Sequence, residues 1–292
     1  MSFKPARLQQ NCSMEAVTLA YDLFEQNDVR QDANPIILIH GIFWNKFMMK
    51  ELGRALSKET KRKVYTLDLR NHNESPSCKK CDMVLMTEDI KKFFRDHNIK
   101  TATFICHSFS SPIAYLIALE QPQLVEKMVM IDHGPYVELS EKNRLENVLS
   151  QYNAQNRFLR SLDPKLTLAD AKKKILSIAA MPSATKAQEL FLKKVAYDLL
   201  KEGQKFKWKT DIDFVMEKYT DMAFVVKAKG RCEHEILIVR CSNSVRVSDE
   251  KFVGILKQNP NAKLETIDDT THLLMLEKMD IFVEIVKKFL DS

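Results

Sequence analysis

The sequence predicts an α/β protein with a mostly parallel, doubly wound sheet and an inserted helical segment. Short, wholly apolar runs, suited to strands buried on both faces, alternate with stretches of helical periodicity. One long block, residues 136–233, interrupts this alternation with helical patterns only. A serine stands where one of the apolar runs meets the helix after it. Alternating strands and helices imply right-handed crossovers, which place helices on both faces of the sheet.

The expected elements follow one another in chain order. Seven strands are expected, of which the first alternates polar and apolar residues and the next five are mainly apolar: Val17–Phe24, Asn34–His40, Lys63–Leu69, Ala102–Cys106, Lys127–Ile131, Ile236–Arg240 and, as the last strand, Lys263–Ile267. Apolar residues at helical spacing predict four helices between or after them: Phe47–Thr60, Met83–Asn98, Ser111–Gln121 and Asp280–Leu290.

The block from residue 136 to 233 contains no convincing strand. It is expected to form a cap of amphipathic helices over Glu138–Tyr152, Leu166–Ala180, Lys186–Lys201 and Asp211–Ala228. The chain then divides into residues 1–135, the first part of the core, residues 136–233, the cap, and residues 234–292, which add the last strands and the C-terminal helix.

The cap carries the net charge of the whole chain. It holds 19 Lys and Arg against 13 Asp and Glu, and the difference, 19 − 13 = +6, equals the formal net charge of all 292 residues. A solvated helical surface is the simplest interpretation, and attraction to an anionic membrane surface or an acidic partner is the alternative. Nucleic-acid binding is not expected, because no aromatic-interleaved basic motif accompanies the charge.

Composition excludes several other classes of protein. No apolar run approaches the roughly 18–20 residues that span a bilayer. Residues 1–11 lack the apolar stretch of a signal peptide, so the protein is not expected to be secreted and its six cysteines are expected to be reduced. Cys78 and Cys81 form a lone C-x-x-C motif without further ligands at zinc spacing, so no metal site is predicted.

Ser108 stands at the apex of a predicted strand–turn–helix junction and resembles the nucleophile elbow of α/β-hydrolases. Such a turn exposes the serine oxygen above the sheet and aims the next amide N–H at the reacting carbonyl. Cys106 and Ser110 replace the two glycines of the usual G-x-S-x-G pattern, and both are small enough for a tight turn. Ser108 is therefore the candidate nucleophile, with an ordinary buried strand–helix junction as the alternative.

The other parts needed for acyl transfer have candidates too. A serine hydroxyl needs a base, and α/β-hydrolases place theirs late in the chain, in the order serine, acid, histidine. Of the seven histidines, His272 alone lies after the last expected strand. The pair His40-Gly41 follows a core strand, and its glycine allows the chain to turn back over the sheet. The backbone amides of Ile42 and Phe109 are then the expected donors to the tetrahedral oxygen.

The acid that orients the base has several candidates. The usual position, just after the strand Ile236–Arg240, has no carboxylate until Asp249. Asp132 is the favoured acid because it lies at the carboxyl end of the strand after the elbow, from which a carboxylate can reach the histidine. Asp213, at the start of the last cap helix, is the main alternative. The remaining candidate acids are Asp249 and the pair Asp268 and Asp269.

Four stretches of the sequence resemble the α/β-hydrolase superfamily, and within it the abhydrolase domain-containing protein 11 group of serine esterases and lipases. His40–Lys46 resembles its HGLFGSK-like loop, and Asp68–Pro76 resembles its D-x-R-N-H-G-x-S-P segment. His107–Ser110 with Leu124–Asp132 resembles its elbow and the following strand, and Phe206–Asp213 resembles a cap segment that leads to an aspartate. Asn73 replaces the glycine of the second segment, and asparagine tolerates the left-handed conformation best among the other residues.

The resemblance implies a serine hydrolase that cleaves carboxylic esters, with acylglycerols or similar lipid-like esters as substrates. It carries the nucleophile and the base to Ser108 and His272, and the acid to Asp132 or Asp213. No cofactor is expected. A ligand- or partner-binding protein with weak or no turnover is the alternative, since the elbow lacks its glycines. The group suggests a mitochondrial location, and the short segment before the first strand leaves a cytoplasmic one as the alternative.

Overall fold

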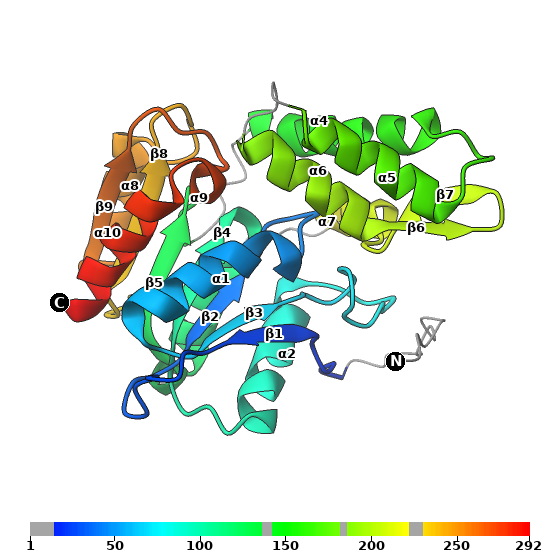
Figure 1. Cartoon of the computed structure of the whole chain (residues 1–292). Helices are drawn as coiled ribbons and strands as arrows, with labels where there is room; N and C mark the ends of the chain where they lie inside the picture. Colours follow the sequence, from blue (N-terminus) through cyan, green and yellow to red (C-terminus); the bar gives the residue numbers. More distant parts are fainter. Residues whose placement is uncertain (1–14, 136–141, 182–185, 222–229) are drawn as a thin grey trace.

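The computed structural model describes residues 15–135, 142–181, 186–221 and 230–292, and it contains a seven-stranded sheet (Figure 1). The strand order is β1-β3-β2-β4-β5-β8-β9, with β1 antiparallel to β3 and every other neighbouring pair parallel. The predicted α/β class with a mostly parallel sheet is confirmed. The strands are β1 Tyr21–Phe24, β2 Ile36–Ile39, β3 Val64–Leu67, β4 Ala102–His107, β5 Val125–Ile131, β8 Ile236–Cys241 and β9 Ala262–Ile267.

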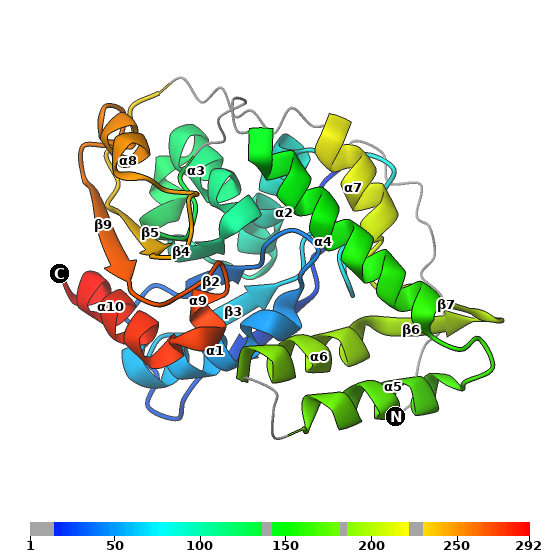
Figure 2. The same ribbon diagram turned by 90° about the horizontal axis from the view of Figure 1, so that it is seen from above.

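Helices cover both faces of this sheet, as Figure 2 shows from above. On one face lie α1 Lys46–Thr60 and α10 Met279–Asp291; on the other lie α2 Met83–Asp96, α3 Ser111–Glu120 and α8 Asp249–Leu256. The four residues of β2 and the four of β3 are all buried, because apolar side chains on both faces meet helices. The short helices α8 and α9 Leu274–Glu277 were not anticipated from periodicity.

The first strand is shorter than predicted. A strand was expected over Val17–Phe24, but it begins only at Tyr21. Two side chains take up the amides upstream: Val17 N–H donates to Asp89 Oδ1 at 2.7 Å, and Ala20 N–H donates to Ser75 Oγ at 2.9 Å. These bonds replace the ladder, so the alternating pattern of Val17 to Ala20 reflects burial against the core and not pairing with a strand.

The inserted segment between β5 and β8 is not purely helical, which corrects the sequence-based expectation. It contains α4 Lys142–Ser161, α5 Leu168–Ala179, α6 Lys186–Asp198, α7 Ile212–Asp221, and an antiparallel hairpin of β6 Leu199–Glu202 and β7 Lys205–Trp208. The helix expected over Lys186–Lys201 therefore stops at Asp198. Gly203 adopts φ +57° in the two-residue loop, a conformation that suits glycine and favours a tight hairpin.

Some sequence-based expectations fall outside the described residues. The predicted helix start at Glu138 and the last part of the helix expected over Asp211–Ala228, residues 222–228, are among them. The division into residues 1–135, 136–233 and 234–292 stays a prediction. Among the helices of the described ranges, none combines the length and the apolar character that crossing a membrane requires.

The loop after β3 shapes the carboxyl edge of the sheet. Asp68 accepts hydrogen bonds from Lys46 N–H and from Asn73 Nδ2, both at 2.7 Å, and so ties this loop to the start of α1. Asn73 has φ +44°, which is the left-handed conformation expected where asparagine replaces glycine. Arg70 and Asp89 form an ion pair in which neither side chain is exposed, so the segment is anchored in the interior.

Candidate active site

Ser108 occupies a strained turn between β4 and α3. Its φ is +54°, a left-handed value that an L-residue adopts at a cost, and a short 3₁₀ turn over Ser108–Ser110 leads into the helix. Ser110 fits without a glycine because its hydroxyl turns inward and donates to the backbone oxygens of Ile39 and His107, at 3.0 and 3.1 Å. The replacement of glycine therefore adds hydrogen bonds to the turn instead of crowding it.

His272 and Asp132 meet at the same edge of the sheet. Asp132 directly follows β5, and its Oδ2 lies 2.7 Å from Nδ1 of His272, which comes from the loop after β9. Because a carboxylate only accepts, Nδ1 carries the hydrogen and Nε2 keeps its lone pair. The carboxyl ends of parallel strands share one edge, so residues 140 positions apart come into contact.

Further donors hold the Asp132 carboxylate ionised. Burial opposes its ionisation, but hydrogen bonds from His272, from Ser244 Oγ at 2.7 Å and from Cys241 N–H at 3.2 Å outweigh burial and lower the pKa of Asp132. Arg246 approaches the same carboxylate, with Nε 3.9 Å from Oδ2. Sequence reasoning missed Ser244 and Arg246, since a polar loop gives no sign of which side chains turn inward.

His272 is itself held in its neutral form. Burial lowers its pKa below the usual value, the positive charge of Arg246 lowers it further, and Asp132 acts in the opposite direction. A neutral imidazole with its Nδ1–H directed at a carboxylate has the chemistry of a general base.

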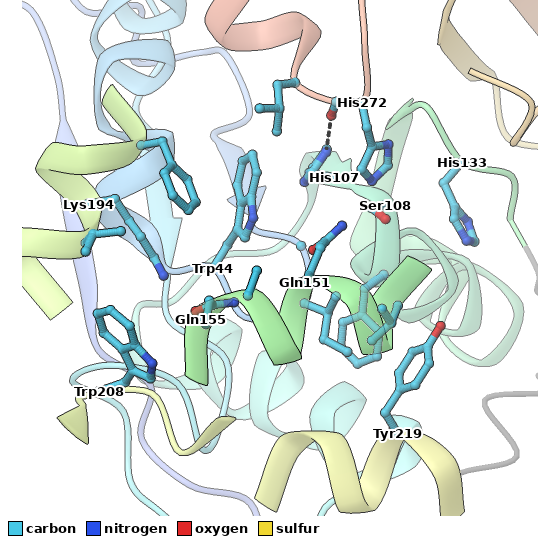
Figure 3. Close-up of a pocket in the computed structure, with 18 of the residues that line it drawn as sticks. Trp44, His107, Ser108, His133, Gln151, Gln155, Lys194, Trp208, Tyr219 and His272 are labelled. Carbon is cyan, nitrogen blue, oxygen red and sulfur yellow. Dashed lines mark hydrogen bonds between the residues drawn. The ribbon is translucent and has the colours of Figure 1, made fainter. Parts of the chain in front are cut away.

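His107 positions the His272 loop from behind. Its Nε2–H donates to the backbone oxygen of His272 at 2.9 Å, and its ring centroid lies 4.6 Å from those of both Trp44 and His272 (Figure 3). Burial lowers the pKa of His107 well below the usual histidine value. Gly41 packs so close that a Cβ there would lie 2.6 Å from Nδ1 of His107, which explains the glycine. Nothing in the sequence indicated this bond, which joins residues 165 positions apart.

The expected oxyanion loop lies beside the elbow. Ile42 and Phe109 both line the cavity into which Ser108 opens. Phe43 adopts φ +59°, and Trp44 N–H donates to Gly41 O at 3.1 Å, so the chain turns back sharply after β2. This local turn places the backbone of Ile42 at the carboxyl edge of the sheet, where the sequence expected it.

The cavity has a volume of about 470 Å³ and lies between the sheet edge and the inserted segment. One wall, which we call the core wall, comes from the loops at the strand ends, and the other, the cap wall, comes from α4, α6, β7 and α7 (Figure 3). The core wall holds Gly41, Ile42, Trp44, His107, Ser108, Phe109, His133, Arg246, His272 and Leu273, and the cap wall holds Val148, Gln151, Ala154, Gln155, Phe158, Phe191, Leu192, Lys194, Val195, Trp208 and Tyr219.

The other candidate acids lie elsewhere. Asp213 accepts a hydrogen bond from Tyr152 Oη at 2.6 Å on the cap. Asp249 pairs with Arg240 at 2.5 Å and is 84% exposed. Neither contacts the His272 ring, and the same holds for Asp268 and Asp269, so Asp132 is the carboxylate bonded to that ring in the described part of the chain. Within the same residues, no three His, Cys, Asp or Glu side chains gather as metal ligands.

Comparison with known proteins places this fold in a family. A family model described as the alpha/beta hydrolase fold matches residues 34–192, more than half of the 292 residues. The chain belongs to the alpha/beta hydrolase fold family. Its resemblance to the abhydrolase domain-containing protein 11 group is also confirmed, as a distant homology: the sn-1-specific diacylglycerol lipase ABHD11 of Xenopus tropicalis is 25% identical over 287 residues, covering 94% of this chain and 83% of the relative.

Two further comparisons show the range of this similarity. A probable alcohol acetyltransferase of Saccharomyces cerevisiae is 36% identical over 125 residues, which is 40% of this chain and 36% of the yeast protein. The solved structure of a marine microorganism esterase superposes with a TM-score of 0.72 at 20% identity, covering 94% of this chain and all of the esterase. At that identity the superposition shows a common fold.

Proposed function

We propose that this protein is a serine hydrolase that cleaves carboxylic esters through an acyl-enzyme, with Ser108 as nucleophile, His272 as base and Asp132 as the acid that orients it. The observation that carries the proposal is the 2.7 Å contact between Asp132 and His272, in a cavity that Ser108 also lines from a strained elbow. A nucleophile, a base and an orienting carboxylate together are the minimum set for this chemistry.

In the first half of the reaction, His272 Nε2 takes the proton of Ser108 as its oxygen attacks the acyl carbon. The backbone N–H groups of Ile42 and Phe109 stabilise the resulting oxyanion, and Asp132 stabilises the imidazolium. The C–O bond to the leaving group then breaks. His272 gives its proton to the departing oxygen, and the alcohol leaves.

In the second half, water attacks the acyl-enzyme while His272 takes a proton from it. The tetrahedral intermediate collapses, the bond to Ser108 breaks, and the proton returns to the serine oxygen. The acid leaves, and the enzyme regains its starting protonation state. No cofactor takes part in either half.

The cavity supports an apolar acyl substrate. Most of its cap wall is aliphatic or aromatic, and about 470 Å³ accommodates a medium-sized ligand. The diacylglycerol lipase named among the relatives acts on a lipid ester, which agrees with acylglycerols or similar esters as the substrate class here. We also propose that residues 136–233 act as a cap whose positive charge favours anionic lipid surfaces. The mitochondrial or cytoplasmic location stays a prediction.

Labelling with a fluorophosphonate probe and hydrolysis of p-nitrophenyl esters test the proposal. Wild type should label and hydrolyse, and Ser108→Ala should lose both while its circular dichroism and thermal unfolding stay native. Ser177→Ala, on the exposed surface of α5, is the matched serine control and should label like wild type. Full esterase activity in Ser108→Ala would overturn the assignment of the nucleophile.

The same assay decides between an enzyme and a binding protein. A wild-type protein that neither labels nor hydrolyses, yet binds fatty acids, would support the alternative in which the altered elbow has lost turnover. Adding a short alcohol then distinguishes hydrolysis from acyl transfer, the activity named for the yeast relative. A hydrolase forms mainly the acid, whereas a transferase forms mainly the new ester.

A further inference from the structure

Two side chains with N–H donors, Lys194 and Trp208, lie near each other on the cap wall of the cavity, where Gln155 also lies (Figure 3). Lys194 comes from α6 and Trp208 from the end of β7, and both line the cavity. The Lys194 Nζ lies 5.8 Å from the centroid of the Trp208 ring. In Figure 3 the two lie on the opposite side of the cavity from Ser108 and His272.

The indole N–H of Trp208 is unsatisfied. The residue is only 5% exposed, and its Nε1 has no hydrogen-bond partner among the residues that the structure describes. An indole nitrogen only donates, and a buried donor without an acceptor is costly, so such groups are rare and ask for an explanation. Trp208 lines the cavity, so a molecule bound there that reaches the edge of the indole ring would supply the acceptor.

Lys194 offers a second donor at the same place. Its side chain is 3% exposed, and its ammonium contacts two acceptors: Phe43 O at 3.1 Å and Asp198 Oδ2 at 2.7 Å. The contact with Phe43 O is a hydrogen bond and the contact with Asp198 is an ion pair, so an ammonium with three N–H donors keeps a donor for a ligand. The Lys194 side chain also lines the cavity.

The charge at this place is already balanced. Asp198 has no exposed surface, pairs with Lys194 through Oδ2 and accepts a hydrogen bond from Asn45 Nδ2 at Oδ1. A substrate carboxylate here would have to share the ammonium with a buried carboxylate, and the repulsion between two like charges opposes this. A neutral oxygen has no such penalty, and its lone pairs accept from an ammonium or an indole N–H.

We propose that Lys194 and Trp208 form a polar subsite for a neutral hydrogen-bond acceptor, a carbonyl, ether or hydroxyl oxygen in the part of the ester remote from the scissile bond. The inference builds on the proposed esterase function and narrows its substrate class: esters that carry a second oxygen at one position along the chain are preferred over plain alkyl esters. Lys194 and Trp208 are specificity-determining residues in this proposal, and the reaction itself takes place at the core wall.

A set of matched esters tests the subsite. The probes are p-nitrophenyl esters of straight-chain acids of equal length, in which a keto group moves along the chain, with the unsubstituted ester as reference. Wild type should prefer one keto position by about tenfold in kcat/KM, the effect of one or two well-placed hydrogen bonds. Trp208→Phe, which removes the N–H and keeps an aromatic ring, should reduce that ratio to between one and three.

Two further variants make the kinetic test decisive. The double variant Lys194→Met, Asp198→Asn removes both members of the ion pair, so that no buried charge is left unpaired. It should also abolish the keto preference. Phe191→Leu alters the same wall without changing a donor and should keep the wild-type ratio. A ratio near one at every keto position in wild type would overturn the subsite, while turnover of the plain ester would still support the esterase.

Fluorescence tests the subsite without turnover. The chain has two tryptophans, so Trp44→Phe leaves Trp208 as the sole indole emitter. A long-chain ketone should shift its emission to longer wavelength, because a new hydrogen bond to the indole N–H lowers the energy of the excited state, and an alkane of equal length should not. Equal spectra with both ligands, under conditions where a displaced fluorescent fatty acid proves that both bind, would contradict the proposal even if no ester were hydrolysed.

Discussion

The two walls of the cavity differ in what their hydrogen-bonding groups contact. On the core wall, Asp132 accepts from His272, Ser244 and Cys241, and His107 donates to the backbone behind the base. On the cap wall, the indole N–H of Trp208 has no acceptor in the described part of the chain. The acid and the base of the core wall are thus positioned before a ligand arrives, whereas in our proposal a ligand supplies the acceptor for Trp208.

The walls differ equally in how their residues are held. Core-wall side chains follow buried parallel strands, whose register fixes each strand end relative to its neighbours. Cap-wall side chains stand on amphipathic helices, and large apolar residues of this segment, such as Leu176 and Phe191, remain exposed. The difference agrees with the proposed division of labour, in which the sheet edge supplies the chemistry and the inserted segment selects the substrate.

The largest expected effect falls on the base of the core wall. His272→Ala should lower kcat by a factor on the order of 10⁶, because loss of the base disables the serine. Single-turnover and steady-state hydrolysis of a p-nitrophenyl ester measure it. His97→Ala is the control: His97 packs against Tyr21 and Phe93 at the far end of α2, and its loss should leave kcat near wild type. Normal turnover in His272→Ala would refute the role of the core wall.

The acid gives a direct contrast between the walls. Asp132→Asn should keep the fold but lower kcat by up to about 10⁴, since an amide in this place favours the wrong tautomer of His272. Asp213→Asn should change kcat less than about threefold, because asparagine keeps an oxygen that accepts from Tyr152 and this residue does not contact His272. If Asp213→Asn lowered kcat strongly and Asp132→Asn did not, Asp213 would be the orienting acid and the proposed division between the two walls would be wrong.

Lowering the pH below 6.5 should destabilise the core wall and not the cap, because residues 136–233 contain no histidine. Burial holds the pKa of both His40 and His107 well below the usual 6.5. Below pH 6.5 these histidines bind protons in the unfolded chain but stay neutral in the folded chain. Stability that is present above pH 6.5 is therefore lost as the pH falls toward the folded pKa values.

A variant at His107 measures this effect. His107→Gln keeps a donor for the backbone oxygen of His272 but no longer titrates. Its free energy of unfolding in urea should fall less steeply with acid than that of wild type, by up to about 1.4 kcal/mol per pH unit. Parallel slopes for the two proteins between about pH 5 and 7 would contradict the buried neutral state.

The smallest expected effect concerns Arg246. Its charge lowers the pKa of His272, so Arg246→Gln should move the acid limb of the kcat/KM profile to higher pH and leave the alkaline plateau in place. Arg240→Gln is the matched control, because Arg240 pairs with Asp249 outside the cavity. An unshifted acid limb in Arg246→Gln would show that this charge does not act on the base.

Much of the core wall was predictable because its signals are local. Buried parallel strands read as apolar runs, and the turn after β4 places Ser108 at the apex whatever the rest of the chain does. The favoured acid, Asp132, was also chosen from its place at a strand end. The contact with His272 that singles it out from Asp213 needed the folded chain, since residues so far apart meet only through strand order.

The cap shows where sequence reasoning stops. Periodicity indicated helices but missed the hairpin of β6 and β7, although Gly203 between two short alternating runs is a turn signal. It also gave no reason to single out Lys194, a lysine at an apparently ordinary helical position. Its burial depends on α6 lying against the loop of Phe43, and that packing belongs to the tertiary structure.

The sequence by itself determined the class of sheet, the serine at its turn, and the glycine and histidine that flank the expected oxyanion loop, because each depends on neighbouring residues. The tertiary structure decided which carboxylate reaches His272, that His107 braces the base, and that Lys194 and Trp208 share one wall with a donor to spare. The contacts of His272 with Asp132 and His107 join residues distant in the chain, and only the order of the parallel strands brings them within hydrogen-bond reach. Lys194 and Trp208 lie near each other because of how α6 and β7 fold within the inserted segment.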